Sequence, residues 1–213
     1  MKLSELFKIC ISLDYPDIGN SANHVTKRDG DTLYIFFEAS DGKADWDVNL
    51  DFPAKAYKRM GNTAWFAHRG FLELWKKTET YLKDAIADKS INKIIITGFS
   101  HGAAMALLCH EYVWFNRPDL RSSLLGYGFG CPRVIWWLNK AELRARWASF
   151  TVIRNAEDVV THLPPALLGY THVGKMLEIG TRGKYSSTEA HYPENILKEL
   201  NIYESRYIKN QRP

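Results

Sequence analysis

The sequence is organised around Ile94-Ile95-Ile96-Thr97-Gly98-Phe99-Ser100-His101-Gly102-Ala103-Ala104-Met105, in which an apolar, β-branched run breaks into Gly-x-Ser-x-Gly and then into small helix-forming residues. This order predicts a strand, a sharp turn and a helix, the arrangement called a nucleophile elbow, with Ser100 at the apex of the turn. Gly98 and Gly102 would let strand and helix approach closely, and the first amides of the helix would point toward an oxyanion formed at Ser100. The stretch therefore predicts a nucleophilic serine. A plain tight turn is the alternative, because the pentapeptide also arises by chance in loops.

Length and composition point to one globular unit. The 213 residues, 46% of them hydrophobic and 24% charged, suit a single core, and we expect one domain over 1–213. The net charge of +4 is spread along the chain, which argues against a nucleic-acid partner. Cys10, Cys109 and Cys131 lack metal-type spacing and are expected to be small buried hydrophobes. We expect no metal and no organic cofactor.

The N-terminal segment has an apolar helical face, but Glu5 and Lys8 interrupt the apolar run that a secretion signal would need. No stretch approaches the roughly 20 apolar residues that span a bilayer, so any contact with lipid surfaces would be peripheral. We therefore expect a cytoplasmic protein, with a secreted mature form as the alternative.

Strands and helices alternate along the chain. Apolar residues at helical spacing predict a helix over about 71–88, directly before the elbow strand. This alternation favours an α/β fold with a mostly parallel central sheet. Trp136, Trp137, Leu143 and Trp147 are expected to cover a helical part of the core. The other expected elements are strands over 32–37, 124–130, 149–154 and 175–179, a connection over 14–31 and a last helix from about Glu194 to Asn201.

A carboxylate and a histidine downstream of the elbow complete the residue types of a hydrolase. Asp158 follows the strand over 149–154, and its apolar neighbours could bury one side of it, whereas Glu157 could equally be a solvated loop charge. His191 is the expected base, because it lies on a late loop from which it could reach both serine and acid. His172 is expected to have a hydrogen-bonded structural role. His162 lies too close to Asp158 to be the first choice, but could border the substrate.

Ser40 follows the strand over 32–37, at the end where parallel sheets place their chemistry. From this segment alone, a Ser-Asp-Gly turn is the simpler interpretation.

Several separated segments resemble motifs of the class 3 lipases, the group that includes the secreted fungal triacylglycerol lipases. Gly98 to Gly102 is similar to the family's Gly-His-Ser-Leu-Gly, and Asn155 to Pro165 is similar to its Asn-x-x-Asp-x-Val-x-x-Leu-Pro-Pro. Phe37-Glu38-Ala39-Ser40 stands where the family carries Phe-Arg-Gly-Thr/Ser. The other similar segments are 45–50, 68–71, 129–134 and 170–174.

The resemblance implies an α/β-hydrolase fold with helices on both faces of the sheet. It implies Ser100 as nucleophile, Asp158 as acid and His191 as base. It also implies the backbone amides of Ser40 and His101 as an oxyanion hole, helped by the Ser40 hydroxyl. Two departures stand out: Glu-Ala replaces Arg-Gly before the oxyanion serine, and Phe and His flank the nucleophile where His and Leu are usual.

A short lid is expected at 41–53. Trp46 and Leu50 on this lid, together with Phe99 and His162, are the expected contacts of the substrate. Because four aspartates crowd the lid, we expect little activation by lipid interfaces and a preference for short or medium acyl chains.

The expected function is that of a serine carboxylic-ester hydrolase, a lipase or esterase acting through a Ser-His-Asp triad and an acyl-enzyme on acylglycerols or related esters. Within the same class, a phospholipase or a feruloyl-type esterase is the alternative. From another class, the alternative is a non-catalytic binding protein that keeps the fold.

Overall fold

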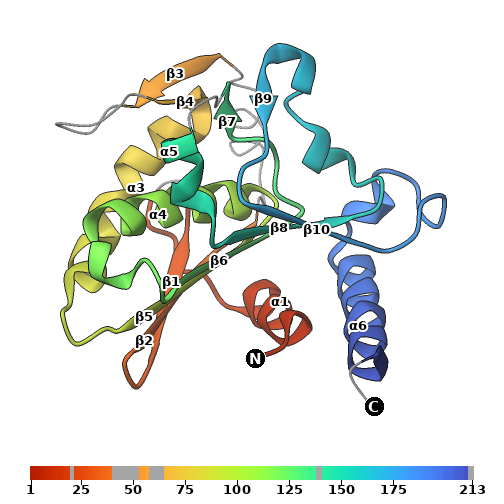
Figure 1. Cartoon of the computed structure of the whole chain (residues 1–213), viewed down its shortest axis with the longest axis horizontal. Coiled ribbons are helices and arrows are strands. Elements are labelled where there is room, and N and C mark those ends of the chain that lie inside the picture. Colours follow the sequence, from red (N-terminus) through yellow and green to blue (C-terminus); the bar gives the residue numbers. More distant parts are fainter. Residues whose placement is uncertain (20–21, 40–52, 58–64, 138–140, 211–213) are drawn as a thin grey trace.

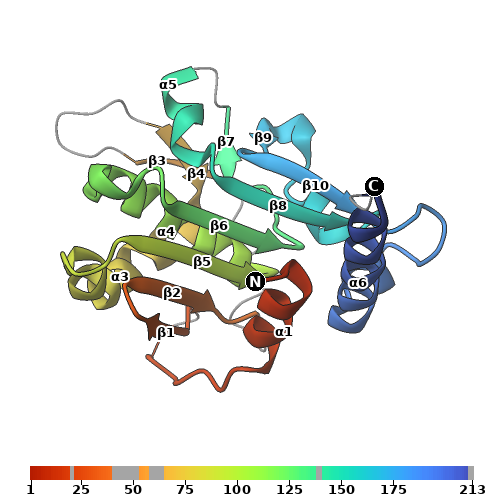
Figure 2. The same cartoon turned by 60° about the horizontal axis from the view of Figure 1, so that its bottom comes forward.

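The computed structural model describes residues 1–19, 22–39, 53–57, 65–137 and 141–210. Six strands form a central sheet in the order β1-β2-β5-β6-β8-β10, side by side in Figure 2. Of the strand pairs described in this sheet, only β1–β2 is antiparallel, so the expectation of a mostly parallel sheet is confirmed. The strands are β1 (His24–Asp29), β2 (Thr32–Phe37), β5 (Lys93–Phe99), β6 (Leu124–Phe129), β8 (Phe150–Asn155) and β10 (Lys175–Ile179).

Helices cover both faces of this sheet. Figure 1 shows α1 (Leu3–Ser12) and α6 (Pro193–Asn210) on one side, and α3 (Arg69–Ala87) and α4 (His101–Asn116) on the other. Strand β5 contributes side chains to the cores on both sides of the sheet, since successive side chains of a strand point to opposite faces. Ile94 and Ile96 therefore join the core under α4, and Ile95 joins the smaller core under α1 and α6. A strand buried on both faces explains the unbroken apolar run of the sequence.

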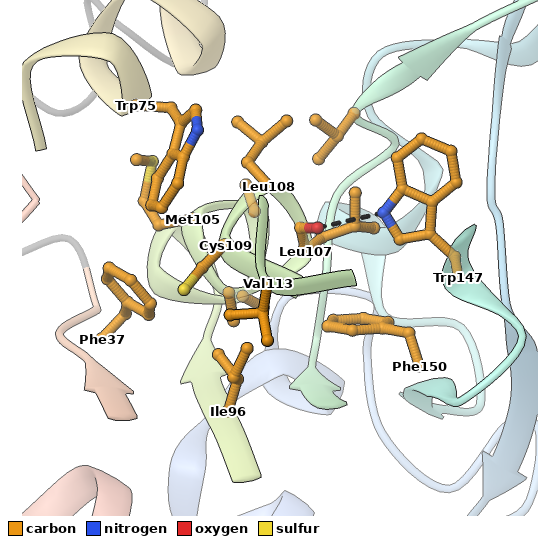
Figure 3. Close-up of a cluster of buried hydrophobic side chains, with 14 of the residues drawn as sticks. Phe37, Trp75, Ile96, Met105, Leu107, Leu108, Cys109, Val113, Trp147 and Phe150 are labelled. Atoms are coloured by element: carbon orange, nitrogen blue, oxygen red, sulfur yellow. Dashed lines mark hydrogen bonds between the residues drawn. The ribbon is translucent and has the colours of Figure 1, made fainter. Parts of the chain in front are cut away.

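The larger core is built around α4 (Figure 3). Nearly every residue of this helix is buried, which fits a helix that is hydrophobic all round. Phe37 and Ile96 approach it from the sheet and Trp75 from α3. Trp147 packs on the far side, where its Nε1 donates a hydrogen bond to the Leu107 carbonyl at 3.0 Å. The helix that follows Ser100 is thus held on all sides, and its first turn is a rigid part of the site.

A second sheet, which the sequence analysis did not predict, lies beyond α3 and α4 in Figure 1. Its strands pair antiparallel in the order β3-β4-β7-β9. They are β3 (Ala54–Tyr57), β4 (Trp65–His68), β7 (Ile135–Trp136) and β9 (Tyr170–Thr171). Strands of two to four residues are too short to show an alternating pattern, which explains why they were missed.

The expected helical cover at 136–147 is partly wrong. Trp136 lies in β7, where its ring meets Phe66 and its Nε1 donates to the Leu168 carbonyl at 2.9 Å. Trp137 is 65% exposed. Leu143 in α5 (Ala141–Arg144) and Trp147 are buried as expected. The two tryptophans were assigned to one helix, whereas Trp136 is the last residue of β7 and Trp137 follows that strand with a φ of +40°.

Two further boundaries differ from the sequence prediction. The segment expected as a connection contains β1, whose last four residues are exposed, so the strand lacks an apolar pattern. Helix α6 continues to Asn210, well beyond the predicted end. All three cysteines are buried free thiols, as expected. Among the described residues, none of the helices has the length and apolar character needed to cross a membrane. The single domain over 1–213 stays a prediction.

Candidate active site

Ser100 lies at the junction of β5 and α4, with φ +55° and ψ −120°. This conformation is strained for a residue with a side chain, and it is held from both sides. The Ser100 amide donates to the Phe129 carbonyl on β6 at 2.9 Å. Strand and helix also cross so closely that a Cβ on Gly98 would lie 2.1 Å from the Gly102 carbonyl oxygen. The structure therefore contains the sharp strand-to-helix turn that the sequence predicts.

His191 reaches this turn from a 3-10 helix, Glu189–His191, that leads directly into α6. Its Nε2 lies 2.9 Å from the Ser100 hydroxyl oxygen. The ring stacks on Phe99, with centroids 4.9 Å apart and planes at 27°. On another side the ring meets Gly130, where a Cβ would lie 2.7 Å from the His191 Cε1. The imidazole is thus fixed in one orientation by packing as well as by its polar contacts.

Asp158 completes the chain of contacts. Its Oδ2 lies 2.9 Å from the Nδ1 of His191, and its Oδ1 accepts the Val160 amide at 2.9 Å. The side chain is fully buried, so these contacts replace the water that an exposed carboxylate would bind. A carboxylate can only accept, so Nδ1 carries the proton and Nε2 is left to accept the proton of Ser100.

The loops that carry the acid and the base are tied to each other. Asn155, the last residue of β8, donates its Nδ2 to the Ala190 carbonyl at 2.8 Å. The Val159 amide donates to the Ser187 carbonyl at 3.1 Å. Asn155 begins one of the motifs that resemble the lipases, but its partner lies 35 residues away, so nothing in the sequence indicates this role.

Helix α6 supports the same region. Glu199 on α6 is 3% exposed, and its carboxylate accepts hydrogen bonds from Lys184 and from the Tyr185 hydroxyl. Both donors belong to the loop that precedes His191. The position of the base therefore depends on a buried carboxylate of the next helix.

The other candidate residues take different places. Glu157 accepts the Gly183 amide at 3.1 Å and is not part of the chain of contacts. His162 is exposed, and its Nδ1 contacts the Asp158 carbonyl at 2.9 Å rather than the carboxylate. His172 contacts the Thr161 carbonyl at 2.8 Å through Nε2, and burial lowers its pKa to about 4. It is held neutral in a structural position, as the sequence analysis expected.

His101 is 2% exposed, and its ring packs edge-on against Phe71 on α3, with ring centroids 5.5 Å apart. Its unusual side chain thus fills the interface between α3 and α4, while its backbone opens the first turn of α4. Ser40, Trp46 and Leu50 lie outside the described residues, as does most of the lid expected at 41–53.

A cysteine lies beside the acid. Cys131 is fully buried, and burial, with a further contribution from the Asp158 charge, raises the pKa of its thiol. The thiol therefore stays protonated, and Ser100 is the nucleophile that the geometry favours over it.

Comparisons with known proteins agree on one family. The family described as "Lipase (class 3)" matches residues 34–168. A lipase of Rhizomucor miehei is 31% identical over 149 residues, which is 68% of this chain and 40% of that protein. A secreted mono- and diacylglycerol lipase of Malassezia restricta is 30% identical over 139 residues, 61% of this chain and 42% of that protein.

Solved structures show the same likeness. A triacylglycerol lipase whose catalytic centre is a serine protease triad matches 76% of this chain and 62% of its own, with a TM-score of 0.60 and 27% identity. A fungal lipase in complex with an inhibitor matches 84% of this chain and 78% of its own, with a TM-score of 0.62 and 26% identity. The chain spans about 40% of the length of the curated relatives it matches.

Proposed function

Because this chain belongs to the class 3 lipase family and has the α/β-hydrolase fold, we propose that it is a serine carboxylic-ester hydrolase acting through Ser100, His191 and Asp158. The observation that carries the proposal is the unbroken series of contacts from the Ser100 hydroxyl through His191 to Asp158, each 2.9 Å long. Such a series activates a serine that would otherwise be a weak nucleophile.

In the proposed reaction, His191 Nε2 takes the Ser100 proton as Oγ attacks the ester carbonyl carbon. Asp158 stabilises the resulting imidazolium through Nδ1. The imidazolium then gives its proton to the departing alcohol, which leaves an acyl group on Ser100. Water then attacks the acyl carbon while His191 takes a proton from it, and the bond from that carbon to Ser100 Oγ breaks as His191 returns the proton to Oγ, which releases the acid. No step needs a metal or an organic cofactor.

The tetrahedral intermediate needs donors for its oxyanion. We assign this role to the backbone amides of Ser40 and His101, with help from the Ser40 hydroxyl. His101 opens the first turn of α4, where the backbone amides and the helix dipole favour a negative charge. Loss of one such donor typically costs about 2.7–4 kcal/mol of transition-state stabilisation.

We propose acylglycerols with short or medium acyl chains as substrates, since relatives are named as lipases of mono-, di- and triacylglycerols. The four aspartates in 41–51 support a polar entrance with little interfacial activation. Phe99 and His162 are proposed to border the substrate with Trp46 and Leu50. Phospholipids and feruloyl esters are the alternatives within the class.

A chain-length series tests the substrate. Rates on soluble tributyrin are expected to exceed those on emulsified long-chain triglyceride, with no jump when the substrate passes its solubility limit. A jump at that limit for the long-chain substrate would contradict the proposal. The cytoplasmic location remains a prediction with a secreted mature form as its alternative, since one relative is named as secreted, and fractionation of the cells that make the protein, together with their medium, would test it.

The nucleophile is tested by Ser100→Ala, with Ser205→Ala as a matched control on α6. Ser205 is exposed, and its hydroxyl donates to the Asn201 carbonyl of its own helix. Hydrolysis of p-nitrophenyl butyrate is expected to fall by at least about 10³-fold in the first variant and to stay unchanged in the second. Retained activity in a folded Ser100→Ala protein would refute the assignment.

A further inference from the structure

The end of β2 lies against the elbow. Phe37, its last residue, pairs with Gly98 of β5, and the chain then continues through Glu38 and Ala39 toward position 40. The carbonyl oxygens of Phe37 and Glu38 touch the first turn of α4, since a Cβ on Gly102 would lie 2.5 Å and 2.3 Å from them. The two segments that would flank the oxyanion are therefore packed backbone to backbone.

Asn23 holds this strand end from the other side. Its carbonyl accepts the Glu38 amide at 3.0 Å, and its Nδ2 donates to the Glu38 carboxylate at 2.8 Å. Its Oδ1 accepts the Ile18 amide at 3.1 Å, from the loop that follows α1. One residue thus connects three segments, and Glu38 is bound to it through both backbone and side chain.

The end of β2 is also packed on the face that points toward α1. Cys10 contacts the Phe37 carbonyl through its sulfur at 3.8 Å. Ala39 and Tyr15 pack on the smaller core, and the Tyr15 hydroxyl donates to the Cys10 carbonyl at 2.7 Å. With α4 on one face and α1 on the other, the Asn23 contact fixes the strand end along its edge.

We propose that Asn23 and Glu38 are positioning residues for oxyanion stabilisation, which they serve by holding the end of β2 against the first turn of α4. The inference rests on the proposed function. It explains how Glu38 can stand where the family carries arginine: its carboxylate has an amide donor in Asn23. A backbone donor placed in advance stabilises developing charge without having to reorganise.

The amino end of the same strand offers a matched control. The Asn92 amide donates to the Asp31 carbonyl at 2.9 Å, and Asn92 Nδ2 donates to the Asp31 carboxylate at 3.2 Å. The side-chain contact of this pair has the same chemistry as that of the Asn23–Glu38 pair, an amide that donates to a carboxylate, but it lies at the opposite end of β2 from Ser100. Asn92→Ala therefore removes an equivalent contact without touching the site.

The experiment compares Asn23→Ala, Glu38→Ala, Glu38→Gln and Asn92→Ala in the full chain, with p-nitrophenyl butyrate as substrate. The alanine variants of Asn23 and Glu38 are expected to lower kcat by about 10- to 100-fold with little change in KM, because a displaced donor is lost only in the transition state. Glu38→Gln keeps an oxygen that accepts from Asn23, so it is expected to restore kcat to within about threefold of wild type. Asn92→Ala is expected to leave kcat and KM unchanged.

A second readout separates positioning from a loss of fold. Phenylboronic acid forms a tetrahedral adduct with an activated serine, and its inhibition constant is expected to rise in step with the fall in kcat/KM. If Asn23→Ala does not fold, the Glu38→Ala and Glu38→Gln pair decides. Wild-type kcat in Glu38→Ala, an equal loss in Asn92→Ala, or an unchanged inhibition constant would overturn the inference. A wild-type protein that hydrolyses no ester would instead overturn the proposed function.

Discussion

Adding one methyl group at Gly130 should lower the catalytic rate through a contact with His191 that a control substitution of another glycine does not make. Gly130 has φ +56°, and its amide donates to the Ile153 carbonyl at 2.9 Å, so its backbone is fixed. In Gly130→Ala the new Cβ would lie 2.7 Å from the Cε1 and 2.9 Å from the Nδ1 of His191, and 3.0 Å from the Asp158 carboxylate.

The Gly130→Ala substitution should lower both the folding stability and the catalytic rate. An L-residue in this left-handed conformation costs about 1–2 kcal/mol of folding stability. The imidazole must also retreat by about 0.8 Å, because carbon atoms pack at roughly 3.5–4.0 Å. Both contacts of the His191 ring are 2.9 Å long, so a retreat of this size weakens at least one of them. A misplacement of about 1 Å can cost about 10²-fold in rate, and we expect kcat to fall by that factor.

Gly30→Ala is the matched control, since Gly30 has φ +59° and a Cβ at this position would meet nothing within 4 Å. In urea unfolding both variants should show the loss of stability that the left-handed conformation causes, and Gly130→Ala should lose more because its methyl group also crowds His191. Only Gly130→Ala should lose activity on p-nitrophenyl butyrate. The reasoning is refuted if folded Gly130→Ala keeps kcat within about threefold of wild type, or if Gly30→Ala loses as much activity.

Three further predictions follow from the same contacts. Asp158→Asn should lower kcat by about 10⁴-fold while the protein stays folded, because an amide that donates to Nδ1 of His191 forces the imidazole proton onto Nε2. Kinetics with a thermal-melt control would check this, and a fall in kcat of less than about tenfold would contradict it. Asn155→Ala, which releases the Ala190 carbonyl, should lower kcat by about 10-fold with KM unchanged, whereas a change in KM alone would argue against a positioning role. Burial lowers the pKa of His172 from 6.5 to about 4, so the folded state should lose about 3 kcal/mol of stability as the pH falls from 6.5 to 4. Urea unfolding of His172→Gln should show a smaller loss over the same pH range, and an equal loss would exclude this histidine as the cause.

The parts of the fold that the sequence predicts are those in which burial leaves a continuous or periodic pattern. The run at Ile94–Ile96 is apolar because both faces of β5 are covered, and the helix that follows is apolar because α4 is buried all round. By contrast, β1 owes its place to hydrogen bonds with β2, and its side chains carry no apolar pattern. Trp137 could not be distinguished from a core tryptophan, because a residue that follows a short strand can be exposed even when it is of a type usually found in cores.

The candidate site likewise contains some residues that the sequence predicts and others that it does not. Ser100, Asp158 and His191 could be chosen from chain order and chemistry, and the structure brings the three together, although their roles stay predictions. Gly130 and Asn155 were missed, because each acts on residues far along the chain and neither carries chemistry of its own. Residues that orient a catalytic group are defined by three-dimensional contacts, which one sequence does not display.

The central claim is that Ser100 is an activated nucleophile, and reaction with a fluorophosphonate probe tests it most directly, because only an activated serine reacts readily. The wild-type protein is expected to gain one probe adduct, located by mass spectrometry on the peptide that contains Ser100. Ser100→Ala should gain none, and His191→Ala should react far more slowly. A folded wild-type protein that is not labelled, or one labelled equally in Ser100→Ala, would contradict the account.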